Sequence, residues 1–329
     1  MALSALVRPL LSVLSPAGPG AALTILIFHR VLPAPDPLFP DEVDVARFDT
    51  ICRCLKQWFQ VLPLAKAVQA LAAGRLPARA AAITFDDGYA DNHDAAMPVL
   101  QRHGLSATFF IATGFLDGGV MWNDQVIEAL RRSARADIDL GDIGLPAARL
   151  ALGSVAERRS AVDAVLTAAK YLALDDRAQV AQRLLAVCGV ASPQGLMMSS
   201  RQVQAMHSRG MGIGAHTVNH PILARLSAGA AQEEMGRSKA QLESLLQTPV
   251  GLFAYPNGRP ERDYVAPNVA AVQALGFDAA VSTAPGVAVA GSDLFQIPRF
   301  TPWDRAPWRF GLRLARNLRT PVARVARLV

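Results

Sequence analysis

The sequence has few cysteines and no long uninterrupted run of apolar residues. Only three cysteines occur among 329 residues; Cys52 and Cys54 lie too close together for an ordinary disulfide, and Cys188 is remote from both. A disulfide framework is therefore not indicated, and we expect a reducing compartment, with the protein in the cytoplasm. Because no stretch of 18 apolar residues occurs, we expect no membrane-spanning helix.

Acidic residues are missing from the end of the chain. Seven arginines and no acid follow Asp304, so the formal net charge of +6 leaves the first 304 residues with a charge near −1. The basic tail, residues 305–329, therefore accounts for the positive charge, and the main body is not expected to bind nucleic acid. No internal repeat or low-complexity segment occurs, and nothing in the sequence specifies an oligomeric state.

Helical patterns occur at both ends of the chain. Within residues 1–20, apolar side chains recur at helical spacing: Leu3, Leu6, Val7, Leu10, Leu11 and Leu14. Arg8 interrupts this stretch, which favours a retained amphipathic helix over a cleaved signal peptide. In the tail, an arginine stripe accompanies an apolar stripe: Arg309, Arg313, Arg316, and Phe310, Leu314, Leu318. That pattern fits either peripheral contact with an anionic membrane surface or a solvated helix packed on the domain.

Between these ends, strand-like apolar runs alternate with helical patterns. The chain is 51% apolar, enough for a sizeable core. Strand-like runs are expected at residues 22–28, 80–85, 107–112, 212–215, 250–254, 279–282 and 294–300. Strands that alternate with helices predict an α/β fold with a parallel sheet or barrel. Residues 121–200 interrupt this order and are expected to form a mainly helical insertion.

Polar side chains stand directly after most of these strands. The set comprises His29, Asp86 with Asp87, His216, Tyr255 and Arg299. In a barrel of parallel strands, the loops at the carboxyl ends gather on one face, where active sites lie. We therefore expect these side chains to share one site.

Asp86 and Asp87 are adjacent acids within the segment Thr-Phe-Asp-Asp-Gly, residues 84–88. Burying two carboxylates together costs desolvation and repulsion, which a bound metal or a shared proton can offset. An ordinary turn is the alternative, since Asp-Gly is a common turn pair. Asp91 and Asn92, a few residues further on, are expected to cap the following helix.

His216 and His220 offer partners for one of these acids. Pro221 disfavours a helix at His220, so both histidines are expected in a loop after a strand. With Asp87 they make two nitrogen ligands and one oxygen ligand, which suits a catalytic metal with open positions. Zinc is the first expectation for this divalent metal, with cobalt, nickel or iron as alternatives. Histidines that are only hydrogen-bonded structural residues are the other interpretation.

Three segments in this order resemble the motifs of the polysaccharide deacetylases of carbohydrate esterase family 4, which share the NodB-homology fold. They are residues 84–88, 216–220 (His-Thr-Val-Asn-His) and 253–258 (Phe-Ala-Tyr-Pro-Asn-Gly). The resemblance covers about residues 22–302 and implies a distorted (β/α) barrel of about seven strands, so we expect a deacetylase domain over residues 21–304. It implies a metal-dependent hydrolase that removes N-acetyl groups from sugars during synthesis of a polysaccharide or glycolipid. An O-acetyl esterase and a catalytically impaired sugar-binding protein are the alternatives.

The resemblance also implies a role for each motif residue. Asp86 is then the general base that activates a metal-bound water, and the backbone around Tyr255 supplies an oxyanion-hole donor. Asn257 of the third motif is expected to contact the sugar. Outside the motifs, Trp122 is expected to stack on the sugar, with ordinary packing as the equal alternative. The implied metal ligands are Asp87, His216 and His220.

Two departures from the family pattern concern the base and the proton donor. Many members carry an arginine that orients the base where Ala254 stands. Arg299 is the candidate replacement, and a surface arginine is the alternative. Members usually take the general acid from a late histidine, yet no histidine follows His220. His29 resembles the histidine of a subgroup in which this residue precedes the aspartates, so it is the candidate acid, with a structural role as the alternative.

Overall fold

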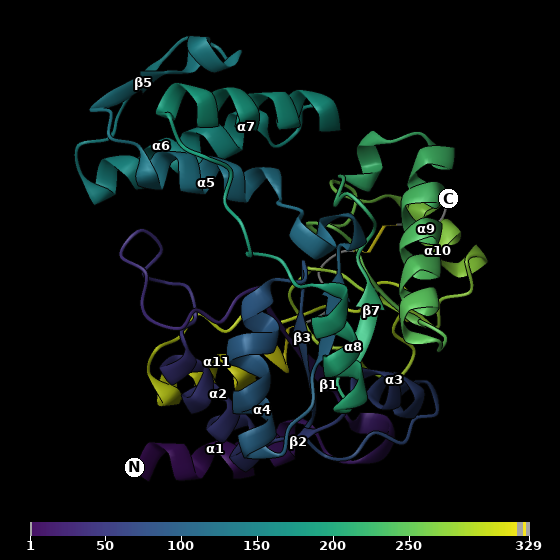
Figure 1. The fold of residues 1–329 in the computed structure, drawn as a ribbon. Coiled ribbons are helices and arrows are strands. Elements are labelled where there is room, and N and C mark those ends of the chain that lie inside the picture. Colours follow the sequence, from purple (N-terminus) through teal and green to yellow (C-terminus); the bar gives the residue numbers. More distant parts are fainter. Residues whose placement is uncertain (1, 321–324, 327–329) are drawn as a thin grey trace. The chain divides into compact units, whose positions relative to one another are not determined.

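Two structural units make up the chain, drawn in Figure 1. The computed structural model describes residues 2–320 and 325–326. The second unit consists of Pro35–Glu42 and Asp117–Met197, and the first contains the other described residues. Arg324 and Arg327 of the expected basic tail lie outside the described residues. Within the described part of the chain, no helix has the length and apolar character needed to cross a membrane.

A curled sheet of seven strands forms the centre of the first unit. The strand order is β1-β3-β4-β7-β8-β9, every pairing is parallel, and β2 pairs with the start of β3. This half-barrel confirms the predicted α/β class with a distorted barrel. The strands are β1 (Leu23–Phe28), β2 (Gln60–Val61), β3 (Ala80–Phe85), β4 (Thr108–Ile111), β7 (Gly212–Ala215), β8 (Leu252–Ala254) and β9 (Ala279–Val281).

The last expected strand, residues 294–300, does not form as a strand. Pro298 lies within it and has no amide hydrogen to donate to a ladder. Instead, the Ile297 amide donates to a carbonyl of β9 at 2.9 Å, and the Phe300 amide donates to a carbonyl of β1 at 2.7 Å. The segment thereby joins the two ends of the curled sheet, and it carries Arg299 between these two contacts.

Alternate side chains of the strands belong to two different apolar clusters. On β4, Phe109 and Ile111 join the larger cluster, which most of the helices share. Phe110 joins a smaller cluster with residues of β1, β8 and β9 and of one helix, residues 64–72, on the inner face of the curled sheet. A Cβ atom at position 214 would lie 2.5 Å from the Phe110 ring, so only glycine fits there on β7. This alternation directs residue 216, two positions further on, towards the inside of the curl.

The helices of the first unit surround this sheet. Side chains cap the starts of two of these helices: the Asp44 side chain accepts from the Arg47 amide at α2, and the Ser227 side chain accepts from the Ala230 amide at α9. The first and last helices, α1 and α11, lie side by side (Figure 1). The helices are α1 (Ala2–Leu14), α2 (Val45–Trp58), α3 (Leu64–Ala72), α4 (Met97–His103), α8 (Ser200–Ser208), α9 (Ala228–Leu246), α10 (Ala266–Ala274) and α11 (Pro307–Asn317). Short helical turns are η1 (Gly18–Gly20), η2 (Asn92–Ala96), η3 (Thr113–Gly118) and η5 (Leu223–Arg225), while η4 (Leu140–Ile143) belongs to the second unit.

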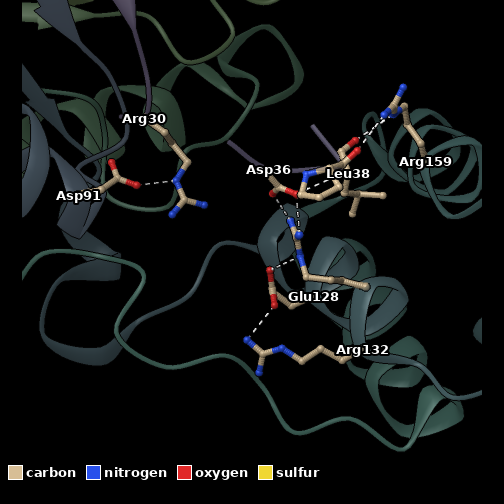
Figure 2. A network of polar contacts seen from close by, with 9 residues as sticks. Arg30, Asp36, Leu38, Asp91, Glu128, Arg132 and Arg159 are labelled. Atoms are coloured by element: carbon tan, nitrogen blue, oxygen red, sulfur yellow. Dashed lines mark hydrogen bonds and ion pairs between the residues drawn. The ribbon is translucent and has the colours of Figure 1, made fainter. Parts of the chain in front are cut away.

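The second unit has an apolar core of its own. Three helices and a hairpin build it: α5 (Trp122–Arg132), α6 (Val155–Ala169), α7 (Leu174–Cys188), β5 (Asp137–Asp139) and β6 (Arg149–Ala151). The loop after β1 joins this unit, because both oxygens of Asp36 accept from Arg131, at 2.9 and 2.6 Å. Arg159 on α6 also donates to the Leu38 carbonyl at 2.8 Å (Figure 2). These non-local contacts attach a loop that sequence order places with the barrel.

Candidate active site

Asp86 and Asp87, directly after β3, are both buried, with 2% and 7% of their surfaces exposed. Asp87 adopts a left-handed backbone conformation (φ 76°), which is uncommon for a residue other than glycine. The two carboxylates have different partners: Asp86 bonds to an arginine, and Asp87 lies against two histidines. Adjacent acids therefore occupy two distinct environments at the end of one strand.

Arg299 binds the Asp86 carboxylate at two points. Its Nη1 and Nη2 atoms each donate to one carboxylate oxygen at 2.7 Å, and Nη1 also donates to the Thr84 hydroxyl at 3.2 Å. The Nε atom donates to the Ser282 carbonyl at 2.8 Å. Only 1% of Arg299 is exposed, so it is a buried partner of Asp86 rather than a surface arginine.

The charges around Asp86 keep it ionised. Burial alone would raise the pKa of this carboxyl, but the neighbouring Arg299 charge, and after it His216, outweigh burial and hold the pKa below its ordinary value. Asp86 is therefore a carboxylate at neutral pH. As a carboxylate it can accept a proton. It is not one of the possible metal ligands, which include its neighbour Asp87.

Asp87, His216 and His220 form a cluster that can hold a metal ion. One ligand atom from each lies within 4.8 Å of the others. The Nε2 atoms of His216 and His220 stand 3.4 and 3.3 Å from Asp87 Oδ1. Burial alone would raise the pKa of Asp87, but His220 and His216 lower it, so this carboxyl too is ionised. The fold thus brings the three predicted ligands together from separate positions in the sequence.

The hydrogen bonds of the cluster indicate that a cation fits between its atoms. His216 Nδ1 lies 2.7 Å from the Ala254 carbonyl, to which it donates when it carries the ring hydrogen, and this leaves the Nε2 lone pair directed at Asp87. Within the part of the chain that the structure describes, His216 Nε2 and Asp87 Oδ1 are buried without a hydrogen-bond partner. Such atoms seldom stay unsatisfied, and a divalent metal accepts this donor set. The geometry does not specify which metal.

The loop that carries the two histidines is held in a strained conformation. Thr217 and His220 have left-handed backbones, with φ of 65° and 49°. Glu234 on α9 accepts from the amides of Val218 and Asn219 at 3.0 and 2.8 Å, and from the Asn219 side chain at 2.7 Å. The residues that Glu234 holds lie between the two histidines in the sequence. The local pattern of α9 gives no sign of it, because the contact depends on tertiary structure.

His29 follows β1 and is exposed, as a group that meets substrate must be. Its carbonyl accepts from the Asn92 side chain at 2.8 Å. Asp91 accepts from the Val31 amide at 3.2 Å and from Arg30 Nε at 2.8 Å (Figure 2). The expected helix cap at Asp91 and Asn92 is therefore wrong: these side chains hold the His29 loop instead, and Asp91 makes no capping bond.

His29 and Asp86 directly follow paired residues of neighbouring strands, because Phe28 pairs with Phe85 in the β1–β3 ladder and the Asp86 amide donates to the Phe28 carbonyl at 2.9 Å. Among the charges that lower the pKa values of Asp86 and Asp87, His29 contributes to each, after larger contributions from closer groups. The segment that carries Arg299 lies beside β1, since the Phe300 amide donates to the Ile25 carbonyl at 2.7 Å. His29 is thus the histidine available at this end of the sheet besides the two in the cluster.

Tyr255 and Asn257 occupy the turn after β8. Tyr255 is buried, which raises the pKa of its hydroxyl well above the ordinary value, and that hydroxyl donates to the Phe295 carbonyl at 2.9 Å. Its amide donates to the Val281 carbonyl at 3.2 Å, so the expected oxyanion donor is engaged with β9 in this structure. Asn257 has a left-handed backbone (φ 58°), and its carbonyl accepts from the Thr283 hydroxyl at 2.7 Å. The expected roles of both residues stay predictions.

Trp122 begins α5 and belongs to the second unit, whereas the site residues described above belong to the first. Its ring lies 5.3 Å from the guanidinium of Arg177, which is buried in the same unit. This contact gives the ring a packing partner. Its expected contact with a sugar stays a prediction.

Known proteins match most of this chain. The sequence profile of the family described as polysaccharide deacetylase matches residues 73–144 and 175–280, more than half of the chain. YxkH of Bacillus subtilis (strain 168), named as a candidate polysaccharide deacetylase, is 21% identical over 281 residues, which cover 85% of this chain and 71% of YxkH.

Solved structures share the fold, among them two bacterial proteins. The deacetylase PplD of Streptococcus pyogenes, solved in complex with acetate, superposes with a TM-score of 0.61 at 20% identity, covering 91% of this chain and 98% of PplD. IcaB of Ammonifex degensii gives a TM-score of 0.58 at 18% identity, covering 93% of this chain and 99% of IcaB. At such identities the similarity establishes the fold.

Proposed function

The chain belongs to the polysaccharide deacetylase family, and on that basis we propose that it is a metal-dependent hydrolase that releases acetate from N-acetylated sugars of a polysaccharide or glycolipid. The observation that carries this proposal is the cluster of buried Asp87, buried His216 and half-buried His220 beside the Asp86–Arg299 pair. One acid lies in a cluster able to hold a metal. The other is ionised, buried and oriented by an arginine.

This division matches what amide hydrolysis requires. An N-acetyl amide is a poor electrophile, and a divalent metal held by Asp87, His216 and His220 would polarise its carbonyl and acidify water. Asp86 then takes a proton from the attacking water as the oxygen adds to the carbonyl carbon. Arg299 keeps the Asp86 carboxylate in one orientation throughout, since both oxygens are bonded to it.

The second half of the reaction breaks the bond between the carbonyl carbon and the sugar nitrogen. The amine leaves only when its nitrogen receives a proton, and His29 is the group we assign to supply it. Its exposure at the end of β1 and its electrostatic effect on both acids support this role. The products are acetate and a sugar ammonium group, which together account for every atom and charge of the amide and the water. The proton that Asp86 has taken passes to solvent, and His29 regains a proton from solvent before the next turnover.

An acetate-release assay tests the proposal. Purified protein is offered N-acetylhexosamine polymers and lipid-linked acetylated sugars, with and without a chelator, and its bound metal is counted. We expect one divalent metal per chain, acetate release that the chelator abolishes, and recovery on adding zinc, cobalt, nickel or iron. The Asp87→Ala variant serves as the matched control without a metal site.

Three other outcomes would replace this proposal. Acetate released only from O-acetylated sugars would make the protein an esterase on the same site. One metal per chain with sugar binding but no acetate from any acetylated glycan would indicate a sugar-binding protein without activity. Release that survives complete metal removal would separate the activity from the Asp87 cluster.

A further inference from the structure

Large apolar side chains are exposed on the first and last helices of the chain. Of the ten large apolar residues exposed among the described residues, six lie on α1, on α11 or just before α11. Single exposed apolar residues are normal on protein surfaces, but a concentration of them in one region marks an interaction site. We call this set the terminal apolar face: Leu6, Leu10, Val13, Trp303, Trp308 and Leu312.

Packing of the two helices does not account for these exposed residues. On α1, Val7 and Leu11 are buried in the main core. On α11, Phe310 and Leu314 of the predicted apolar stripe are buried in the same core, so this stripe faces the protein rather than a membrane. Gly311 lets the helices approach closely, because a Cβ atom there would lie 2.7 Å from Val7. The core is thus complete without the terminal apolar face.

The exposed residues lie in regular stripes rather than at random. Leu6, Leu10 and Val13 are spaced by four and three residues, and Trp308 and Leu312 are spaced by four. On a helix such spacing places side chains in one row. Val13 on α1 is 79% exposed, and Leu312 on α11 is 53% exposed. Each helix therefore has one apolar row in the core and a second one outside.

Positive charge accompanies the outer row of α11. Arg309 and Arg316, three residues before and four after Leu312, are exposed on the same side of the helix. Arg305 and Arg319 flank the helix and are also exposed. The last acid of the chain, Asp304, is already paired with Arg313 at 2.6 Å. This surface consequently has an excess of arginines with no acid among residues 305–320.

Trp303 is held in its exposed position. Its side chain is 70% exposed, yet its carbonyl accepts from Arg47 at 2.7 Å. The Arg313 guanidinium lies 5.0 Å from its ring and 4.7 Å from the ring of Phe300. An exposed tryptophan that is fixed beside arginines is suited to the boundary between water and lipid.

We propose that the terminal apolar face, with the arginines of α11, is a docking surface for an anionic lipid bilayer. The apolar rows enter the boundary between headgroups and acyl chains, and the arginines bind lipid phosphates. A second copy of this chain is disfavoured, because a symmetric interface would place these arginines against each other. Nucleic acid would pair with the arginines but leave the apolar rows exposed. This proposal does not depend on the deacetylase activity.

Vesicle co-sedimentation of the full chain tests the proposal. We expect binding to vesicles of mixed phosphatidylglycerol and phosphatidylcholine, none to phosphatidylcholine alone, and weaker binding as salt is added. The Trp308→Ser/Leu312→Ser variant should bind roughly tenfold more weakly, since two half-exposed apolar side chains no longer enter the lipid. Arg309→Glu/Arg316→Glu should lose at least as much, roughly tenfold or more, whereas the lysine replacements at both positions should bind as the parent does.

Matched controls change the same residue types elsewhere. Val155→Ser/Leu172→Ser removes two exposed apolar residues of the second unit, and Arg102→Glu/Arg237→Glu reverses two exposed arginines outside α11. Both should bind as the parent does, and thermal melting checks that every variant folds. Equal losses in these controls would show that total charge or hydrophobicity causes the binding, and would overturn the proposal.

Two further results would also overturn it. Failure of the full chain to sediment with anionic vesicles at low salt would leave the surface without its assigned partner. Alternatively, light scattering could show a dimer that Trp308→Ser/Leu312→Ser dissociates, which would assign the face to a second copy. Acetate release from a soluble substrate is measured in parallel, so a failure of the proposed activity stays separate from a failure of membrane docking.

Discussion

Arg299 and Asp86 are 213 positions apart in the sequence, and they form a two-point ion pair inside the curled sheet. The arginine reaches the acid because residues 297–300 join β9 to β1, next to β3. The attraction between these two buried charges offsets the free energy of removing them from water, whereas either charge buried alone would destabilise the fold. The pair therefore makes the base of the proposed mechanism dependent on the segment that joins the two ends of the sheet.

Replacing Arg299 with alanine should lower the free energy of unfolding by about 3–5 kcal/mol, because the Asp86 carboxylate is left buried without its partner. Replacing it with lysine should cost less, since the charge stays while the two-point geometry is lost. Arg131→Ala is the matched control: it removes a two-point pair with Asp36 in which the arginine side chain is 31% exposed, and should cost about 1 kcal/mol. Urea unfolding measures all three, and equal losses for the two alanine variants would contradict the argument.

The two adjacent acids should differ in what their removal abolishes. Asp87→Ala should lose the bound metal, because one of its three ligands is gone. Asp86→Asn should keep the metal and lower acetate release about a hundredfold or more, since only the proton acceptor is removed. Metal content by mass spectrometry and acetate release by coupled assay separate these effects. Loss of metal from Asp86→Asn would show that the two acids do not have separate tasks.

Removal of His29 should depend on the leaving group. A sugar amine must be protonated to leave, so His29→Ala should slow acetate release from an N-acetyl sugar about a hundredfold or more. A p-nitrophenolate leaves without a proton, so hydrolysis of p-nitrophenyl acetate should fall far less. His93→Ala, on η2 and paired with Asp94, is the control and should change neither rate. Equal losses on both substrates would mean that His29 is not the proton donor.

Local sequence patterns were sufficient for the elements that carry the site. Predicted strands at residues 80–85 and 212–215 match β3 and β7, since burial on both faces gives continuous apolar runs. The acids and histidines that follow them come together because parallel strands end on one face. The order of the motifs that resemble those of the deacetylases pointed to the same residues. The family profile confirms the resemblance to the deacetylases.

Contacts between distant segments could not be predicted in this way. The local sequence is compatible with a helix cap at Asp91, but in the structure its carboxylate accepts from Arg30 and makes no capping bond. The strand expected at residues 294–300 fails at Pro298, and only tertiary structure shows that Arg299 is then buried beside Asp86. Asp36 likewise binds Arg131, 95 residues away, which no local pattern indicates.

The Asp36–Arg131 pair should make stability depend on pH at the acid end. The hydrogen bond from Arg131 holds the pKa of Asp36 below its ordinary value, despite partial burial that raises it. Its stabilising contribution is therefore full above the unfolded pKa of about 4 and is lost as the pH falls through the lower folded value. Asp36→Asn should be about 1 kcal/mol less stable than the parent at neutral pH, and the difference should shrink below about pH 4. Asp163→Asn, exposed on α6, is the control, and urea unfolding at several pH values measures the difference.

Glu234 should act on metal affinity without touching the metal. It accepts three hydrogen bonds from the loop between His216 and His220, where two backbones are left-handed. Glu234→Gln has one acceptor oxygen in place of two, so the strained loop can relax and the ligands lose their common geometry. We expect metal affinity to fall about 10- to 100-fold, measured by competition with a coloured chelator. Glu233→Gln, next to it and paired with Arg237 on the surface, should leave the affinity unchanged.

A purely structural Glu234 would behave differently in the same experiment. It would lower the thermal midpoint of the metal-free protein and leave the affinity for metal unaltered, because the ligands would settle into the same positions once folded. The positioning role predicts the reverse order of effects: a small change in the metal-free midpoint and a large change in affinity. Since Glu234 lies on α9 and the two histidines on the loop after β7, that result would make the metal centre a property of the packing between helix and sheet.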